Sequence, residues 1–163
     1  MLKVNQVQKK IFSLADLLKK NNEWKTKGES IVFTNGCFDL VHKGHIQMLA
    51  SAADLGSKLI IGLNSDSSIK TLKKNKRPII DEISRSTLLA SFSFVDAVIL
   101  FSEKTPVNLI NKLLPDFLVK GGDYQKENIV GAEIIIKHGG EVVTIPFVDG
   151  FSSSKIIQKI KDL

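Results

Sequence analysis

Two histidines three residues apart, His42 and His45, follow an apolar stretch and a small-residue turn within residues 33–45. Residues three apart on a helix share one face, so both rings can point at the same ligand. A helix that begins here would present free backbone N–H groups and the positive end of its dipole, which favour an anion. Gly36 and Gly44 would let that ligand approach the main chain closely. The arrangement suits the triphosphate of a nucleotide.

Two other interpretations of the histidine pair stay open. Histidines at this spacing can bind a metal ion, although Cys37 is the only cysteine and Asp39 alone would be a poor third ligand. The two rings could also be partly buried structural residues, which is the commoner fate of an isolated histidine. Phosphate chemistry is the interpretation that uses the helix terminus as well as the rings.

The same stretch resembles the HxGH nucleotidyltransferase superfamily, which is marked by a strand, a Gly-x-Phe-Asp turn at 36–39 and His-x-Gly-His at 42–45. Within it, the chain is similar to the adenylyltransferases that make ADP-heptose from heptose 1-phosphate. That closer resemblance extends from about residue 13 to the C-terminus, and its motifs lie at 64–66, 72–73, 77–78, 118–124, 139–142, 149–150 and 152–154.

The resemblance implies transfer of AMP from ATP to D-glycero-β-D-manno-heptose 1-phosphate, with release of pyrophosphate, for lipopolysaccharide core synthesis. The attacking sugar phosphate is already ionised and needs no general base, which agrees with the lack of an obvious Ser/His/Asp or paired-carboxylate arrangement. His42 and His45 would donate hydrogen bonds to the phosphates as the α–β bond breaks. Lys73 would contact the sugar phosphate or span both substrates. Mg²⁺ is expected on the triphosphate, held mainly by substrate oxygens and water.

The resemblance also implies a wider set of binding residues. The candidates for nucleotide binding are Thr34, Asn35, Gly36, Cys37, Phe38, Asp39, Gly44, Lys120, Gly121, Gly122, Asp123, Ser152, Ser153 and Ser154. The candidates for binding the second substrate are Asn64, Asp66, Lys73, Arg77 and Arg85.

Two of these residues keep several interpretations. Asp39 could orient a histidine, meet Mg²⁺ or serve only as a turn-forming residue. Arg85 could serve the pocket, or it could pair with Asp81 or Glu82 as a solvated charge on a helix.

The chain departs from the resemblance near its end. All three hydroxyl positions at 152–154 are serine, which keeps the chemistry. Ile156 and Ile157 stand where other branches carry an arginine. Positive charge near the leaving phosphates must therefore come from another side chain, and Lys155 and Lys73 are the candidates.

Periodicity predicts an α/β fold, a single doubly wound Rossmann-like domain whose five-stranded parallel sheet has helices on both faces. The expected strands lie near 31–34, 59–63, 95–101, 117–120 and 141–145. Helices are expected near 14–25, 44–55, 81–92, 105–114, 132–138 and 152–161. We expect residues 1–29 to form an N-terminal extension with a helix and residues 30–163 to form the nucleotidyltransferase domain. Motifs after strands one, two and four should meet at the carboxyl edge of the sheet.

Composition limits the alternatives. The 163 residues carry a net charge of +6, are 43% hydrophobic and include one cysteine. This balance is ordinary for a soluble protein, and with no apolar signal or membrane span it predicts a cytoplasmic location and no membrane partner. No basic run is interleaved with aromatic residues, so we expect no nucleic-acid partner. We also expect a separate sugar kinase to supply the substrate, and a homodimer in which the segment before Ser30 could form the contact.

Two other functions stay open at this point. One is cytidylyl transfer to glycerol 3-phosphate or a similar small phosphate, because the contacts that choose the base are hidden in the sequence. The other is a non-catalytic nucleotide-binding or RNA-binding module, although such a module has no need of intact histidines and serines.

Overall fold

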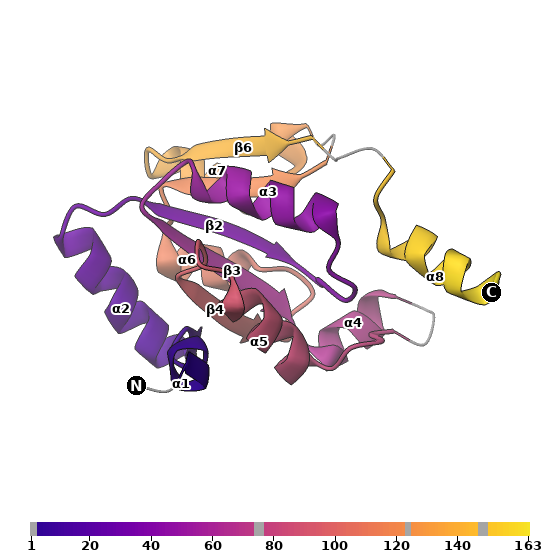
Figure 1. Cartoon of the computed structure of the whole chain (residues 1–163). Coiled ribbons are helices and arrows are strands. Elements are labelled where there is room, and N and C mark those ends of the chain that lie inside the picture. The colour runs from indigo at the N-terminus through magenta and orange to yellow at the C-terminus, as the bar shows by residue number, and fades with distance from the viewer. Residues whose placement is uncertain (1–2, 74–76, 123–124, 147–149) are drawn as a thin grey trace.

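A six-stranded parallel sheet forms the centre of the computed structural model, which describes residues 3–73, 77–122, 125–146 and 150–163 (Figure 1). The strand order is β1-β4-β3-β2-β5-β6. The strands are β1 (Ile11–Phe12), β2 (Ile31–Gly36), β3 (Lys58–Asn64), β4 (Ala97–Phe101), β5 (Phe117–Gly121) and β6 (Glu141–Ile145). The parallel Rossmann-like arrangement is as predicted.

The prediction of five strands is wrong, because β1 adds a sixth at the edge of the sheet. This strand has only two residues, and Ile11 and Phe12 pair in parallel with Val98 and Ile99 of β4. Two residues are too short for any alternation of polar and apolar side chains to be visible in a sequence. The N-terminal part of the chain therefore contributes directly to the sheet.

Helices cover both faces of the sheet (Figure 1). One core cluster joins the sheet to α2 (Leu14–Thr26), α6 (Val107–Leu113) and α7 (Ala132–Lys137). The other joins it to α3 (Lys43–Ala53) and α5 (Glu82–Ser91). Strands covered on both faces carry continuous apolar runs, and in β3 every residue after Lys58 is buried. The remaining helices are α1 (Lys3–Gln8), α4 (Asp66–Leu72), η1 (Lys126–Asn128) and α8 (Ser153–Lys161).

Helix starts follow from capping side chains. Ser13, Ser65, Asp81 and Ser152 each accept a hydrogen bond from the backbone N–H three residues ahead. The cap at Ser65 starts α4, a helix that the predicted elements leave out. None of the helices within the described ranges is both long enough and apolar enough to span a bilayer.

The strand order places a switch point between β2 and β5. From β2 the chain builds outward through β3 and β4, and then returns to the other side of β2 as β5. In open parallel sheets of this kind, ligands bind outside the carboxyl ends of the strands next to the switch point. The predicted site motifs follow β2, β3 and β5, so the fold brings them to one edge.

Candidate active site

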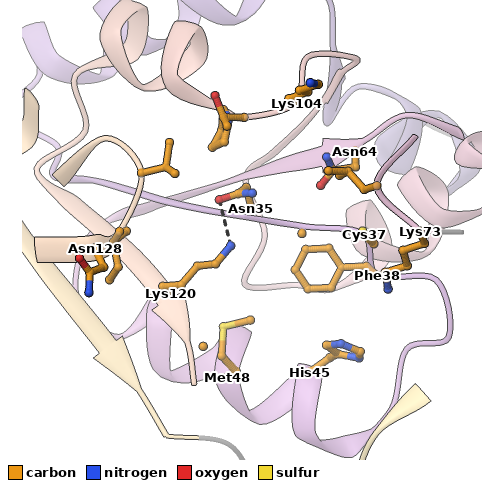
Figure 2. Close-up of a pocket in the computed structure, with 17 residues that line it drawn as sticks. Asn35, Cys37, Phe38, His45, Met48, Asn64, Lys73, Lys104, Lys120 and Asn128 are labelled. Carbon is orange, nitrogen blue, oxygen red and sulfur yellow. Dashed lines mark hydrogen bonds between the residues drawn. The ribbon is translucent and has the colours of Figure 1, made fainter. Parts of the chain in front are cut away.

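A cavity of about 560 Å³ opens at this carboxyl edge (Figure 2). Its walls come from the ends of β2, β3 and β5, the first turns of α3, the end of α4 and two loops. The lining residues are Asn35, Gly36, Cys37, Phe38, His45, Met48, Asn64, Leu72, Lys73, Lys104, Thr105, Pro106, Lys120, Gly121, Asn128, Ile129 and Val130. No carboxylate belongs to this lining as far as the chain is described.

The turn after β2 shapes the floor of the cavity. Phe38 is 4% exposed and adopts a φ of 45°, a left-handed conformation that costs energy for a residue with a side chain. Its ring lies so close to Gly36 that a Cβ at position 36 would meet it at 3.0 Å. A side chain at position 36 would therefore crowd the Phe38 ring. The same ring lies beside His45, with 5.4 Å between ring centroids.

The two histidine rings are stacked, with centroids 3.9 Å apart and 26° between their planes. His42 is the N-cap residue of α3, and His45 is in its first turn. Burial, followed by the nearby His42 and Lys73, lowers the pKa of His45 to about 4. Burial also lowers the pKa of His42. Both rings are thus neutral at pH 7, and their buried Nδ1 atoms have no partner among the described residues.

Arg85 is buried behind the cavity wall and connects two strand ends. Its side chain is 1% exposed, although it projects from α5. The guanidinium group donates hydrogen bonds to the carbonyl oxygens of Cys37 and Asn64 and, through Nε, to Ile80 O at 2.9 Å. Its Nη2 atom pairs with Asp66 Oδ1 at 2.7 Å. Arg85 therefore fixes the end of β2 relative to the end of β3.

These contacts correct one interpretation of Arg85. A solvated charge paired with Asp81 or Glu82 is wrong, because the arginine is buried and its ionic partner is Asp66. The donors of Arg85 are used by protein groups, so it supports the cavity wall from behind and is absent from the lining. Asp66, the ionic partner of Arg85, lines a separate shallow depression together with Ser65 and Lys70.

Asp39 anchors the turn to the segment that precedes α5. Its carboxylate accepts hydrogen bonds from the Arg77 guanidinium and from the N–H groups of Ile79 at 2.8 Å and Ile80 at 3.0 Å. Burial by itself would raise the pKa of Asp39, but the Ile80 N–H, Arg77 and the Ile79 N–H together hold it below its usual value. Both carboxylate oxygens of Asp39 therefore accept hydrogen bonds from the protein, and the Arg77 guanidinium binds Asp39.

The described residues do not fit a resident metal ion. They contain no group of three or more His, Cys, Asp or Glu side chains placed to bind one. Asp39, the one carboxylate of the turn, already accepts three hydrogen bonds from the protein.

Three lysines supply positive charge to the cavity. Lys73 follows α4, Lys120 is the next-to-last residue of β5, and Lys104 lies in the loop after β4. Lys120 Nζ lies 3.5 Å from Asn35 Oδ1, and the two side chains face each other in Figure 2. Burial lowers the pKa of Lys120, and the Cys37 thiol acts in the opposite direction. The cavity is thus cationic and suited to anions.

The other predicted residues lie around this cavity in different ways. Thr34 is fully buried below it, and its hydroxyl has no partner among the described residues. Gly44 packs under the His42 ring, since a Cβ there would meet the ring at 3.2 Å. Gly122 is buried and has a φ of 116°. Asp123 lies outside the described residues.

The serines at 152–154 lie at the start of α8, outside the cavity lining. Ser152 caps the helix, and Ser153 Oγ donates to Leu40 O at 3.2 Å, which joins α8 to the loop before α3. Ser154 follows in the first turn. The helix itself has no buried residue and extends away from the sheet (Figure 1).

Sequence reasoning missed part of the cavity wall. The residues not anticipated are Met48, Leu72, Lys104, Thr105, Pro106, Asn128, Ile129 and Val130. A signal for Lys104 was available, because it lies in the loop that follows the strand predicted at 95–101, at the carboxyl edge of the sheet. Thr105 was expected only as the start of a helix. Nothing in the pattern of residues 128–130 distinguishes them from an ordinary loop.

A cationic cavity at the switch point of a parallel sheet, with a histidine pair on the adjoining helix, defines a nucleotide-binding α/β domain. The family model described as "Cytidylyltransferase-like" matches residues 33–159, and the chain therefore belongs to this family. The predicted class of enzyme, a nucleotidyltransferase, is confirmed by this match.

Relatives and solved structures agree with this assignment. The chain is 53% identical over 155 residues to "Bifunctional protein HldE" of Campylobacter jejuni subsp. doylei, and 47% identical over 152 residues to that of Koribacter versatilis. These matches cover 95% and 93% of the chain but 32% and 31% of the relatives, so the chain spans about a third of their length.

Among solved structures, a lipopolysaccharide core biosynthesis protein from Thermoplasma volcanium is 31% identical, with a TM-score of 0.59 over 74% of this chain and 98% of that one. Pantothenate synthetase from Thermus thermophilus matches with a TM-score of 0.60 over 90% of this chain and 67% of its own. At 14% identity, the second structure shows the fold alone.

Proposed function

We propose that the chain transfers AMP from ATP to D-glycero-β-D-manno-heptose 1-phosphate, which gives ADP-heptose and pyrophosphate for lipopolysaccharide core synthesis. The observation that carries this proposal is the cavity with neutral stacked histidines at one end, three lysines, and no carboxylate in its described lining. The choice of a heptose phosphate as substrate is supported by the identity to HldE proteins. It is also supported by the similar Thermoplasma volcanium structure, whose description names lipopolysaccharide core biosynthesis.

In this reaction, a phosphate oxygen of the sugar attacks the α-phosphorus of ATP, and the bond to the β-phosphate breaks. The attacking oxygen is already ionised, so the protein's work is to position two polyanions and to stabilise the charge that develops. His45 lines the cavity and can donate from a ring nitrogen to an α- or β-phosphate oxygen, with His42 stacked against it. A neutral imidazole keeps one ring N–H, and that group can donate this hydrogen bond.

Other side chains take supporting parts in the proposal. Asn64 and Lys73 would contact the sugar phosphate, because both line the same cavity as His45. Ser153 and Ser154 would meet the outer phosphates at the start of α8, close to the histidine loop through the contact of Ser153 with Leu40. The nucleotide would enter with Mg²⁺ bound to its phosphates. A sugar kinase would make the heptose 1-phosphate, and a dimer of the chain would be the active form.

A panel of substrates tests the assignment. ATP, CTP, GTP and UTP are each combined with heptose 1-phosphate in both anomeric forms and with glycerol 3-phosphate, and pyrophosphate release is followed. The proposal expects turnover with ATP and the β-anomer. Turnover with CTP alone would support the cytidylyltransferase function that the family's description suggests. Binding of RNA with a steep dependence on salt, and no pyrophosphate release, would support the non-catalytic alternative.

A further inference from the structure

Lys120 is a cation in an unusual place. It lies near the end of β5, between β2 and the edge strand β6, and its neighbours are Asn35 on the β2 side and Thr144 on the β6 side. Its side chain is partly buried and lines the cavity. Figure 2 shows its ammonium group directed across the cavity toward Asn35.

The positive charge of the Lys120 ammonium group has one long hydrogen bond and no ion pair among the described residues. Its hydrogen bond to Asn35 Oδ1 is 3.5 Å long, beyond the usual range for an N–H···O contact. The five ion pairs found among the described residues do not include Lys120. A partly buried cation without a counter-ion costs folding free energy, and a bound anionic ligand would offset that cost.

We propose that Lys120 binds a phosphoryl oxygen of a substrate and neutralises its charge, at a cost to the stability of the unliganded fold. This proposal rests on the proposed function, because it assigns a role to one residue of that site. The ligand chemistry is a phosphate group, and it can come from the nucleotide or from the sugar phosphate.

The groups around Lys120 determine whether ligand binding is accompanied by proton uptake. Besides Lys120, the titratable groups on the described cavity wall are Cys37, His45, Lys73 and Lys104. None of these described wall groups is a carboxylate, so the wall offers Lys120 no carboxylate counter-ion. Burial holds the pKa of Lys120 below its usual value in the free protein. A bound phosphate favours the charged form, so binding at alkaline pH should take up a proton.

The test compares Lys120→Met and Lys120→Arg with Lys112→Met, which removes an exposed charge from the last turn of α6. Isothermal titration with ATP, CTP and heptose 1-phosphate, in buffers of different ionisation enthalpy, gives both affinity and proton uptake. Lys120→Met should bind at least one substrate about tenfold more weakly or worse, and Lys120→Arg should bind it better than Lys120→Met. Lys112→Met should stay within about twofold of the wild type.

Thermal unfolding separates this role from a purely structural one, because replacing a structural lysine would lower the Tm. Lys120→Met should have the same Tm as the wild type or a higher one, and it should lose the proton uptake. Weaker binding of the nucleotide alone, or of the sugar phosphate alone, identifies which phosphate Lys120 meets. Unchanged binding of every substrate, or a lower Tm or failure to fold, overturns the proposal. If the wild type binds CTP and not ATP, the proposed function fails, while the same comparison with CTP still tests Lys120.

Discussion

Replacing Arg85 by methionine should be among the most damaging single changes in the chain. Methionine keeps the apolar part of the side chain but removes the hydrogen bonds to Cys37, Asn64 and Ile80 and the ion pair with Asp66. Breaking a buried ion pair from one side costs about 3–5 kcal/mol, and the three carbonyl groups lose a donor as well. Asp66 keeps 28% of its side-chain surface in water, which places the expected loss near 3 kcal/mol.

Urea unfolding followed by circular dichroism measures this loss. Arg85→Met should lower the free energy of unfolding by about 3 kcal/mol, a large part of the 5–15 kcal/mol that is typical of a domain. Lys112→Met, which removes an exposed charge, should change it by less than about 0.5 kcal/mol. The double variant Arg85→Met/Asp66→Asn should lose less free energy of unfolding than the sum of the losses in the two single variants, because the two residues interact directly. A loss below about 1 kcal/mol for Arg85→Met would refute the reasoning.

Three further predictions concern the turn after β2 and the first turn of α3. The pKa of His45, about 4 in the fold against 6.5 in the unfolded chain, means that the unfolded chain binds more protons between these values. The free energy of unfolding should therefore fall as the pH is lowered from 6.5 toward 4, by at most about 2 kcal/mol after solvent screening, and less so in His45→Gln, as pH-dependent urea unfolding would measure. An equal acid sensitivity in both proteins would contradict this. Cys37 is the single cysteine and lines the cavity, so ATP should slow its reaction with a chromogenic thiol reagent about tenfold or more, and an unchanged rate would place the nucleotide elsewhere. Asp39→Asn should lower the Tm and leave the Mg²⁺ concentration for half-maximal activity unchanged, because Asp39 binds protein groups; a raised requirement for Mg²⁺ would make it a ligand.

The large-scale features of the fold could be predicted from the sequence because long apolar runs leave a clear pattern. The strand β3 is buried along nearly its whole length, and its run of apolar residues is unambiguous. The two-residue β1 has no such run, and its place follows only from pairing with β4. α4 was missed because it is short and has only two apolar residues, Ile69 and Leu72, while its start depends on the single cap Ser65.

The candidate site was predictable where its residues are close together in the sequence. The turn and the histidine pair occupy one short stretch, and backbone geometry brings their side chains together. Arg85 shows the limit, because a charged residue on a helix is normally solvated, and only the fold reveals that its partners are the ends of two strands. Residues 128–130 show the same limit, because they line the cavity but follow no predicted strand.

The histidine pair is the central claim, and single-turnover release of pyrophosphate tests it most directly. His42→Ala and His45→Ala are compared with His138→Ala, a matched control whose exposed ring contacts Ile134 O at 2.8 Å on α7, away from the cavity lining. With saturating ATP and heptose 1-phosphate, each variant of the pair should release pyrophosphate at least about 10²-fold more slowly, the scale for the loss of one transition-state donor. The control should match the wild type. Equal rates for His42→Ala, His45→Ala and the wild type would contradict the account.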